Sequence, residues 1–296
     1  KLTDEELFTP VYGAFILELT GDADGVRIIG ETAADYTITS GDVKLDAASL
    51  EKKWDDVLEP VFKAQLPEKS APEKIAYTGG CELKHSSVKV AKPRVLIPVF
   101  PGTNCEYDMA NAFNTYGGDS EIFVIRNLSA KDMEDSVNEF TKHIQNSQII
   151  AIPGGFSGGD EPEGSAKFIN AFFRNPIKDA VEEMLYGRDG LMIGICNGFQ
   201  ALIKLGLVPF GKIVPLTAES PTLTYNTIGR HQSQLTLTRI CTNKSPWLSC
   251  CNVGDIHNIP ISHGEGRFVA PEAVIRQLIA NGQVATQYVD LNGNPT

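Results

Sequence analysis

A cysteine set between two glycines carries the strongest chemical signal in this sequence. The motif GICNGFQ occupies residues 194–200, and an apolar run at 191–195 leads directly into Cys196. A helix is predicted over 199–205, so the turn matches a nucleophile elbow, in which glycines allow a tight bend and close backbone approach. The N-terminus of a helix also favours a thiolate. Cys196 is therefore a candidate nucleophile, with a buried structural cysteine as the alternative.

A glycine-rich loop after another apolar run could supply the hydrogen-bond donors that such a nucleophile needs. Residues 153–160 read PGGFSGGD and follow the apolar run at 149–152. Successive glycines let backbone N–H groups point at the oxyanion of a tetrahedral intermediate. We expect the N–H groups of Gly155 and Asn197 to form this donor pair. A flexible surface turn is the alternative, and a phosphate loop is disfavoured because the order GxxxxGK[ST] is absent.

A histidine and a glutamate at close spacing could provide the base. The sequence HGEGRF begins at His263, which follows a strand-like segment at 259–261, and Glu265 lies two residues further on. Residues at i and i+2 of an extended segment face the same side, so Glu265 can accept from one imidazole nitrogen while the other takes the thiol proton. Such a pair is often purely structural, but the elbow and the glycine loop in the same chain favour the catalytic interpretation.

A second cysteine competes for the role of nucleophile. Cys105 lies in PGTNCEYD, residues 101–108, at the start of a predicted helix. The neighbouring Glu106 disfavours a thiolate, and the glycines that flank Cys196 have no counterpart here. We therefore favour Cys196. The other cysteines form no C-x-x-C ligand set, so we expect free thiols in a reducing compartment and no metal site.

The elements that must position these residues follow an alternating pattern. Short apolar runs at 95–100, 122–125, 149–152 and 191–195 predict buried strands, and helices are predicted from about residue 106, over 130–145 and after Cys196. Strands that alternate with helices predict a parallel sheet covered on both faces, in an α/β fold. Ligands of such sheets bind beyond the carboxyl ends of the strands, which is where the candidate residues lie.

The first part of the chain has a different pattern. We predict strands at 14–19 and 25–30 and a helix over 46–63 in a unit that spans residues 1–68. The apolar face of this helix, expected to be core, carries Leu50, Trp54, Leu58 and Phe62. Residues 69–92 contain Pro72, a pair of glycines and scattered polar side chains, and are predicted to be a linker. Because both ends of the sequence look cut, we expect a piece of a longer polypeptide.

Composition excludes several classes of function. The chain has 296 residues and a formal net charge of -11, without a run of Lys or Arg. Nucleic-acid binding is not expected, because that balance leaves no surplus of cations for phosphates. We also expect no membrane span and no signal peptide, because no apolar run approaches bilayer length. A cytoplasmic protein is therefore expected.

Four motifs in fixed order resemble a known family. PVFPGTNCEYD, PGGFSGGDEPEGS, GICNGFQ and ISHGEGRF are similar to class I, triad-type glutamine amidotransferases, and together they look like the glutaminase domain of the phosphoribosylformylglycinamidine synthase family. The resemblance implies a flavodoxin-like sheet over 93–296, cut short at its C-terminal end. It implies a triad of Cys196, His263 and Glu265, an oxyanion hole at Gly155 and Asn197, and glutamine-binding residues Gly154, Phe156 and Gln200.

The same resemblance implies a function and partners. The domain would hydrolyse glutamine and supply ammonia for the ATP-dependent conversion of formylglycinamide ribonucleotide to formylglycinamidine ribonucleotide in purine biosynthesis. Residues 1–68 are similar to the C-terminal part of an aminoimidazole-ribonucleotide-synthetase-like domain, a small α+β segment. The implied partner is the remaining synthetase part of the same polypeptide. That part would bind ATP and Mg²⁺ in the full-length enzyme, and this chain itself would hold no cofactor.

Two other functions remain open from the sequence. A stand-alone hydrolase of the γ-glutamyl hydrolase kind would use the same cysteine, but residues 1–68 would then have no purpose. A non-catalytic domain of the same fold would not need the combination of Cys196, His263 and Glu265.

Overall fold

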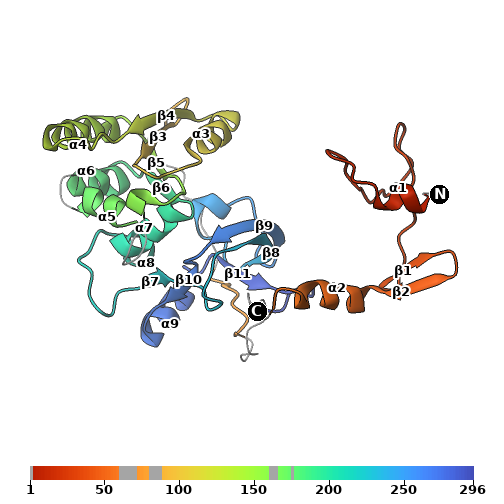
Figure 1. The fold of residues 1–296 in the computed structure, drawn as a ribbon. Helices are drawn as coiled ribbons and strands as arrows, with labels where there is room; N and C mark the ends of the chain where they lie inside the picture. Colours follow the sequence, from red (N-terminus) through yellow and green to blue (C-terminus); the bar gives the residue numbers. More distant parts are fainter. Residues whose placement is uncertain (1–2, 60–71, 80–88, 160–165, 175–176) are drawn as a thin grey trace. The chain divides into compact units, whose positions relative to one another are not determined.

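A computed structural model describes residues 3–59, 72–79, 89–159, 166–174 and 177–296 (Figure 1). The chain divides into two compact units, Lys1–Pro67 and Glu68–Thr296. Each unit is described by itself below.

In its described residues, the first unit contains a short hairpin and two helices. Its elements are α1 Asp4–Phe8, β1 Thr37–Ser40, β2 Val43–Asp46 and α2 Ala47–Asp56. Strands β1 and β2 pair in antiparallel fashion, which was not predicted. Asp46 ends β2 and also caps α2, because its carboxylate accepts a hydrogen bond from the backbone N–H of Ser49 at 3.1 Å.

Three predictions for this unit are wrong. Residues 14–19 and 25–30 form no strand, because a strand needs a partner to complete its hydrogen-bond ladder and neither run has one here. The expected core face of the helix is exposed, with Leu50, Trp54 and Leu58 at 37, 82 and 60%. An apolar stripe is buried only where another layer covers it, and none covers this face of α2 in the described part of the unit. Phe62 lies outside the described residues.

The second unit is built on a parallel sheet, as predicted. Its strands are β3 Arg94–Val99, β4 Asp119–Val124, β5 Ile149–Ile152 and β6 Leu191–Gly194, in the spatial order β4-β3-β5-β6 (Figure 1). All three neighbouring pairs are parallel. The strand order reverses direction between β3 and β5, and this switch point is where the flavodoxin-like fold binds its ligands.

Helices cover both faces of this sheet. They are α3 Glu106–Thr115, α4 Ala130–Gln145, α5 Lys167–Arg174, α6 Lys178–Glu182, α7 Asn197–Leu205 and α8 Leu207–Phe210, with short turns of helix at Ser157–Gly159, Glu183–Gly187 and Pro246–Leu248. On one face Val95 and Ile97 pack against α3, whereas on the other Leu96 and Ile150 join a larger cluster from α4 to α7. Burial on both faces explains why the strands are continuously apolar.

A second group of strands follows α8. It comprises β7 Thr222–Thr224, β8 Gln232–Ile240, β9 Ile256–His263, β10 Arg267–Val269 and β11 Thr286–Val289, with helix α9 Glu272–Ala280 between the last two. Strand β8 is central, with β9 and β11 antiparallel on its two sides, and β10 pairs with β7. His263 therefore lies at the end of β9 in this antiparallel sheet, whereas Cys196 follows a strand of the parallel sheet.

Part of the predicted linker is attached to this second group of strands. The backbone N–H of Tyr77 donates to the carbonyl oxygen of Cys241 at 2.8 Å, and Gln287 Nε2 donates to the carbonyl oxygen of Glu73 at 2.8 Å. Residues 69–71 and 80–88 of the linker lie outside the described residues.

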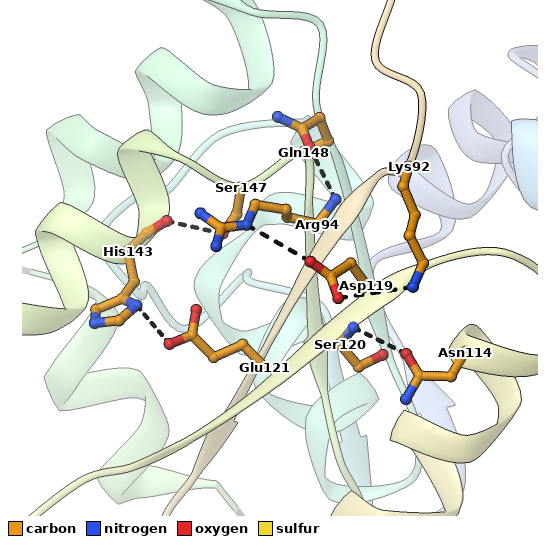
Figure 2. Close-up of polar contacts among 9 residues, drawn as sticks. All are labelled: Lys92, Arg94, Asn114, Asp119, Ser120, Glu121, His143, Ser147 and Gln148. Carbon is orange, nitrogen blue, oxygen red and sulfur yellow. Dashed lines mark hydrogen bonds and ion pairs between the residues drawn. The ribbon is translucent and has the colours of Figure 1, made fainter.

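Side chains fix the amino edge of the parallel sheet (Figure 2). His143 Nδ1 of α4 lies 2.8 Å from Glu121 Oε1 of β4, and the backbone N–H of Arg94 donates to Gln148 Oε1 at 2.9 Å. Further contacts at this edge join Lys92 and Arg94 to Asp119, and Ser120 to Asn114. These pairs hold the starts of β3 and β4, at the opposite end from the candidate site.

Candidate active site

Two loops interlock at the switch point, beyond the carboxyl ends of β3 and β5. Thr103 and Gly155 form a β-bridge, and the backbone N–H of Asn104 donates to the carbonyl oxygen of Gly154 at 2.7 Å. The N–H of Phe156 donates to the carbonyl oxygen of Gly102 at 2.8 Å. Backbone hydrogen bonds therefore fix the glycine loop against its neighbour.

Only glycine fits at the centre of this loop. Gly155 has φ of 123°, a conformation that side chains rarely adopt. A Cβ atom there would lie 2.6 Å from both the Asn104 nitrogen and the Gly102 oxygen. These close contacts restrict the loop to one backbone conformation. Its N–H groups therefore have fixed directions, as an oxyanion site requires.

The chain makes a strained turn at Cys196, between β6 and α7. Cys196 is the N-cap of α7 with φ of 52° and ψ of -106°, an unusual conformation for a non-glycine residue. A Cβ atom on Gly194 would overlap the carbonyl oxygen of Gly198, and one on Gly198 would overlap that of Ile152. The glycines on either side of the cysteine are thus required by contact between backbones, which is the geometry of a nucleophile elbow.

The thiol of Cys196 lies between the glycine loop and the end of β9. A Cβ atom on Gly154 would lie 3.2 Å from Cys196 Cβ, so the loop passes directly beside the cysteine. On its other side Cys196 Sγ donates to the carbonyl oxygen of Ser262 at 3.9 Å. Cys196 is exposed, so a ligand can reach it.

Asn197 and Gln200 connect the glycine loop to the segment that contains Glu265. The buried side chain of Asn197 accepts from the backbone N–H of Ser157 at 3.1 Å and donates to Gln200 Oε1 at 3.0 Å. Gln200 Nε2 in turn donates to the carbonyl oxygen of Glu265 at 2.9 Å. Both ends of the Gln200 amide are thus used within the protein, so its expected contact with glutamine stays a prediction. The ring of Phe156 is 55% exposed beside this site.

Asn226 orients the imidazole of His263. His263 Nδ1 lies 3.1 Å from Asn226 Oδ1, while Asn226 Nδ2 donates to the backbone oxygen of His263 at 2.8 Å. The N–H of Gly266 also donates to Asn226 Oδ1 at 3.1 Å, and a Cβ atom on Gly266 would overlap the imidazole. The ring is therefore held by an amide on one side and by a glycine on another.

The other ring nitrogen of His263 is poised as an acceptor. Nε2 is buried and makes no hydrogen bond. With Nδ1 donating to Asn226, Nε2 carries a lone pair in the neutral ring. Burial lowers the pKa of His263, and the charge of His231 lowers it further. Both effects favour the neutral imidazole, the form that can accept a proton.

The structure brings the sequence-predicted residues to one edge of the sheet, without a hydrogen bond between Cys196 and His263. The sulfur of Cys196 donates a hydrogen bond to the carbonyl oxygen of Ser262, and Nδ1 of His263 hydrogen-bonds to Asn226 Oδ1. The contact between Glu265 and the imidazole therefore stays a prediction. Asn226 and His231 were missed, because no motif marks them. Ser262 lies in the ISHGEGRF motif, but the sequence assigned it no role.

Cys105 is in a less favourable setting than the motif alone suggests. It is the N-cap of α3 with φ of 68° and no side-chain capping bond. Burial, Asp108, Cys196 and Glu106, in that order, raise the pKa of its thiol. A thiol held in the protonated form is a poor nucleophile.

The described ranges contain no cluster of three or more His, Cys, Asp or Glu side chains that could bind a metal ion. None of the helices in those ranges has the length and apolar character needed to span a bilayer.

Comparison with known proteins identifies the family. Residues 92–296 match the family model of the CobB/CobQ-like glutamine amidotransferase domain. The chain belongs to this family. Among curated relatives, phosphoribosylformylglycinamidine synthase subunit PurQ of Sulfurimonas denitrificans is 33% identical over 68% of this chain and 77% of the relative. The subunit PurQ of Aquifex aeolicus is also 33% identical, over 66% and 73%.

A solved structure of a related assembly also aligns with this amidotransferase. The alignment with the structure of PurLQS from Thermotoga maritima covers 69% of this chain and 78% of the other chain, with 26% identity and a TM-score of 0.46. The family assignment rests on the sequence matches and does not depend on this superposition.

Proposed function

We propose that the second unit releases ammonia from glutamine, with Cys196 as the nucleophile. The observation that carries this proposal is the position of Cys196, in a strained turn at the N-terminus of α7 within a glutamine amidotransferase domain. Gly194 and Gly198 allow this turn, since a Cβ atom on either would overlap backbone atoms.

The proposed reaction is acyl transfer to sulfur. Cys196 Sγ attacks the side-chain amide carbon of glutamine, and the oxygen that becomes negative faces the N–H groups of Gly155 and Asn197. The amide nitrogen leaves as ammonia after it is protonated, and water then releases glutamate from the thioester. Gly154 and Phe156 border the bound glutamine, and Gln200 braces its pocket.

His263 is proposed as the base, with Glu265 as the carboxylate that stabilises the imidazolium. Its buried, unbonded Nε2 and lowered pKa support this role. In this structure the thiol bonds to Ser262, the residue just before His263. The proposal therefore includes a shift at the end of β9 that takes Ser262 away from the sulfur and turns the imidazole toward it.

The ammonia is proposed to serve the synthesis of formylglycinamidine ribonucleotide. The curated relatives are named as subunits of phosphoribosylformylglycinamidine synthase, a carbon–nitrogen ligase of purine biosynthesis. In the present protein, a synthetase part on the same polypeptide would bind ATP and Mg²⁺, and residues 1–68 would belong to that part. The enzyme would work in the cytoplasm without nucleic acid or membrane. A γ-glutamyl hydrolase and a non-catalytic domain remain the competing functions.

Glutamine turnover by the full-length enzyme tests this proposal. Cys196→Ala is expected to abolish glutamine hydrolysis, because the thioester cannot form, while synthesis from added ammonia continues. Cys105→Ala is the matched control and should retain the rate within about threefold, since its thiol is held protonated. Glutamine hydrolysis that survives Cys196→Ala would contradict the proposal.

A further inference from the structure

The thiol of Cys196 makes a long hydrogen bond that it loses when it gives up its proton. Its sulfur donates to the backbone oxygen of Ser262 at 3.9 Å, a bond that only the protonated thiol can make. A thiolate at the same place would face the negative end of a carbonyl dipole. The sulfur therefore loses this hydrogen bond, here called the resting contact, when it becomes a nucleophile.

His231 holds the residue that makes the resting contact. Its Nε2 lies 2.9 Å from Ser262 Oγ. In the register of the antiparallel pair Gln232 faces His263, so His231 comes just before β8 begins, beside the point where β9 ends. From this position the His231 side chain reaches the last residues of the neighbouring strand β9.

The same end of β9 carries both the acceptor of the thiol and the proposed base. Ser262 and His263 are adjacent, and Asn226 binds both the ring and the carbonyl oxygen of His263. One displacement of this short segment would release the sulfur and move the imidazole together. The His231–Ser262 bond opposes that displacement from the neighbouring strand.

We propose that His231 is a positioning residue that stabilises the resting contact between Cys196 and Ser262. This inference rests on the proposed role of Cys196 as nucleophile and deepens it. In this role, the hydrogen bond between His231 and Ser262 restrains the thiol before glutamine reacts. Loss of the restraint makes the sulfur more reactive, whereas a merely structural residue would leave it unchanged or less reactive.

The rate of alkylation of Cys196 by iodoacetamide tests the proposal on the intact chain. Peptide mapping at one fixed pH gives the rate for each cysteine. His231→Ala and Ser262→Ala should each accelerate labelling of Cys196 by about threefold, the effect of one weak hydrogen bond. His231→Gln should restore the wild-type rate, because its amide can also donate to Ser262 Oγ. His257→Ala, an exposed histidine near the other end of β9, is the matched control.

The double variant tests whether both residues act through one bond, and Cys241 reports whether each variant is folded. If both residues act through one bond, His231→Ala with Ser262→Ala should be no faster than either single variant. Cys241 is fully buried, so its protection from labelling shows that each variant is folded. Unchanged or slower labelling of Cys196 in the folded single variants would overturn the proposal, and so would additive effects. Alkylation requires no glutamine, so this outcome is independent of whether the enzyme hydrolyses it.

Discussion

The carboxyl and amino edges of the parallel sheet hold their strands in different ways. At the amino edge side chains take part in the contacts, as in the pair His143 and Glu121, and these two groups are 36 and 43% exposed. At the carboxyl edge backbone meets backbone, as in the bridge between Thr103 and Gly155, with no space for a Cβ atom. The first kind of contact tolerates substitution, because water can replace a lost partner. The second does not, and it occurs where Cys196 has to be positioned.

After Cys196→Ala, substitution of the proposed base should show the largest effect at the carboxyl edge. His263→Ala is expected to reduce glutamine hydrolysis by about a thousandfold or more, because the thiol loses its proton acceptor. Glu265→Ala should cost less, since a carboxylate that only orients and stabilises an imidazolium contributes less than the base itself. Steady-state rates of the full-length enzyme measure both.

A small effect of His263→Ala would be informative in a specific way. If the rate stayed within about threefold of wild type, His263 would not be the base, whereas Cys196 could still be the nucleophile. In that case the buried imidazole and Asn226 would serve only to shape the end of β9.

The glycine loop should respond next. Gly155→Ala is expected to lower glutamine hydrolysis by about a hundredfold, because the added Cβ meets the Asn104 nitrogen and the loop must shift its N–H donors. Gly159→Ala is the matched control on the same loop, since φ is also positive there but nothing lies within 4 Å of an added Cβ. It should cost about 1 kcal/mol of stability without a comparable loss of activity. Equal losses of activity in the two variants would show that the close contact at Gly155 is unimportant.

The dependence of stability on pH should reveal the buried imidazole. Burial lowers the pKa of His263 in the folded protein, so the unfolded chain takes up its proton first as the pH falls. The stabilising contribution is therefore present above the unfolded pKa of about 6.5 and is lost as the pH falls through the folded pKa. Urea unfolding between pH 7.5 and pH 5, roughly the range around these values, should show a smaller loss of stability in His263→Ala than in wild type. Identical pH profiles would contradict the burial of a neutral ring.

The amino edge should show the smallest effect. Glu121→Gln removes the carboxylate that lies 2.8 Å from His143 Nδ1 but keeps a group that can hydrogen-bond. The expected loss of stability is below about 1 kcal/mol, as for other exposed ion pairs. Glutamine hydrolysis should stay within about twofold of wild type, since this edge lies at the far end of the strands. A large loss of activity would mean that the two edges are coupled and that the contrast between them is wrong.

Local patterns predicted the parallel sheet well, because each strand finds its partner within this chain. Leu96 and Ile150 lie in apolar runs, and the neighbouring strands and helices that bury them are also part of the sequence. The same kind of pattern failed at residues 14–19 and at Trp54, where the chain has no second layer in the described part of the first unit. Periodicity shows which face of an element is apolar, but it does not show whether anything covers that face.

The candidate site could be predicted only where chemistry and backbone geometry coincide. Glycines reveal the elbow at Cys196 and the loop at Gly155, because no other residue fits there. Asn226 and His231 gave no such signal. Their contacts depend on how β8 and β9 pair and on a loop distant in sequence, and an asparagine or a histidine is tolerated in many exposed loops.

Labelling of the full-length enzyme by a glutamine-mimicking electrophile tests the central claim most directly. Such a reagent binds as glutamine does and then reacts covalently with the nucleophile. Peptide mapping should find the label on Cys196, with the other five cysteines spared and with protection by excess glutamine. The setting of the thiol, exposed in a strained turn beside the glycine loop, is the reason for this selectivity. A label centred on Cys105 would contradict the assignment of Cys196 as the residue that attacks glutamine.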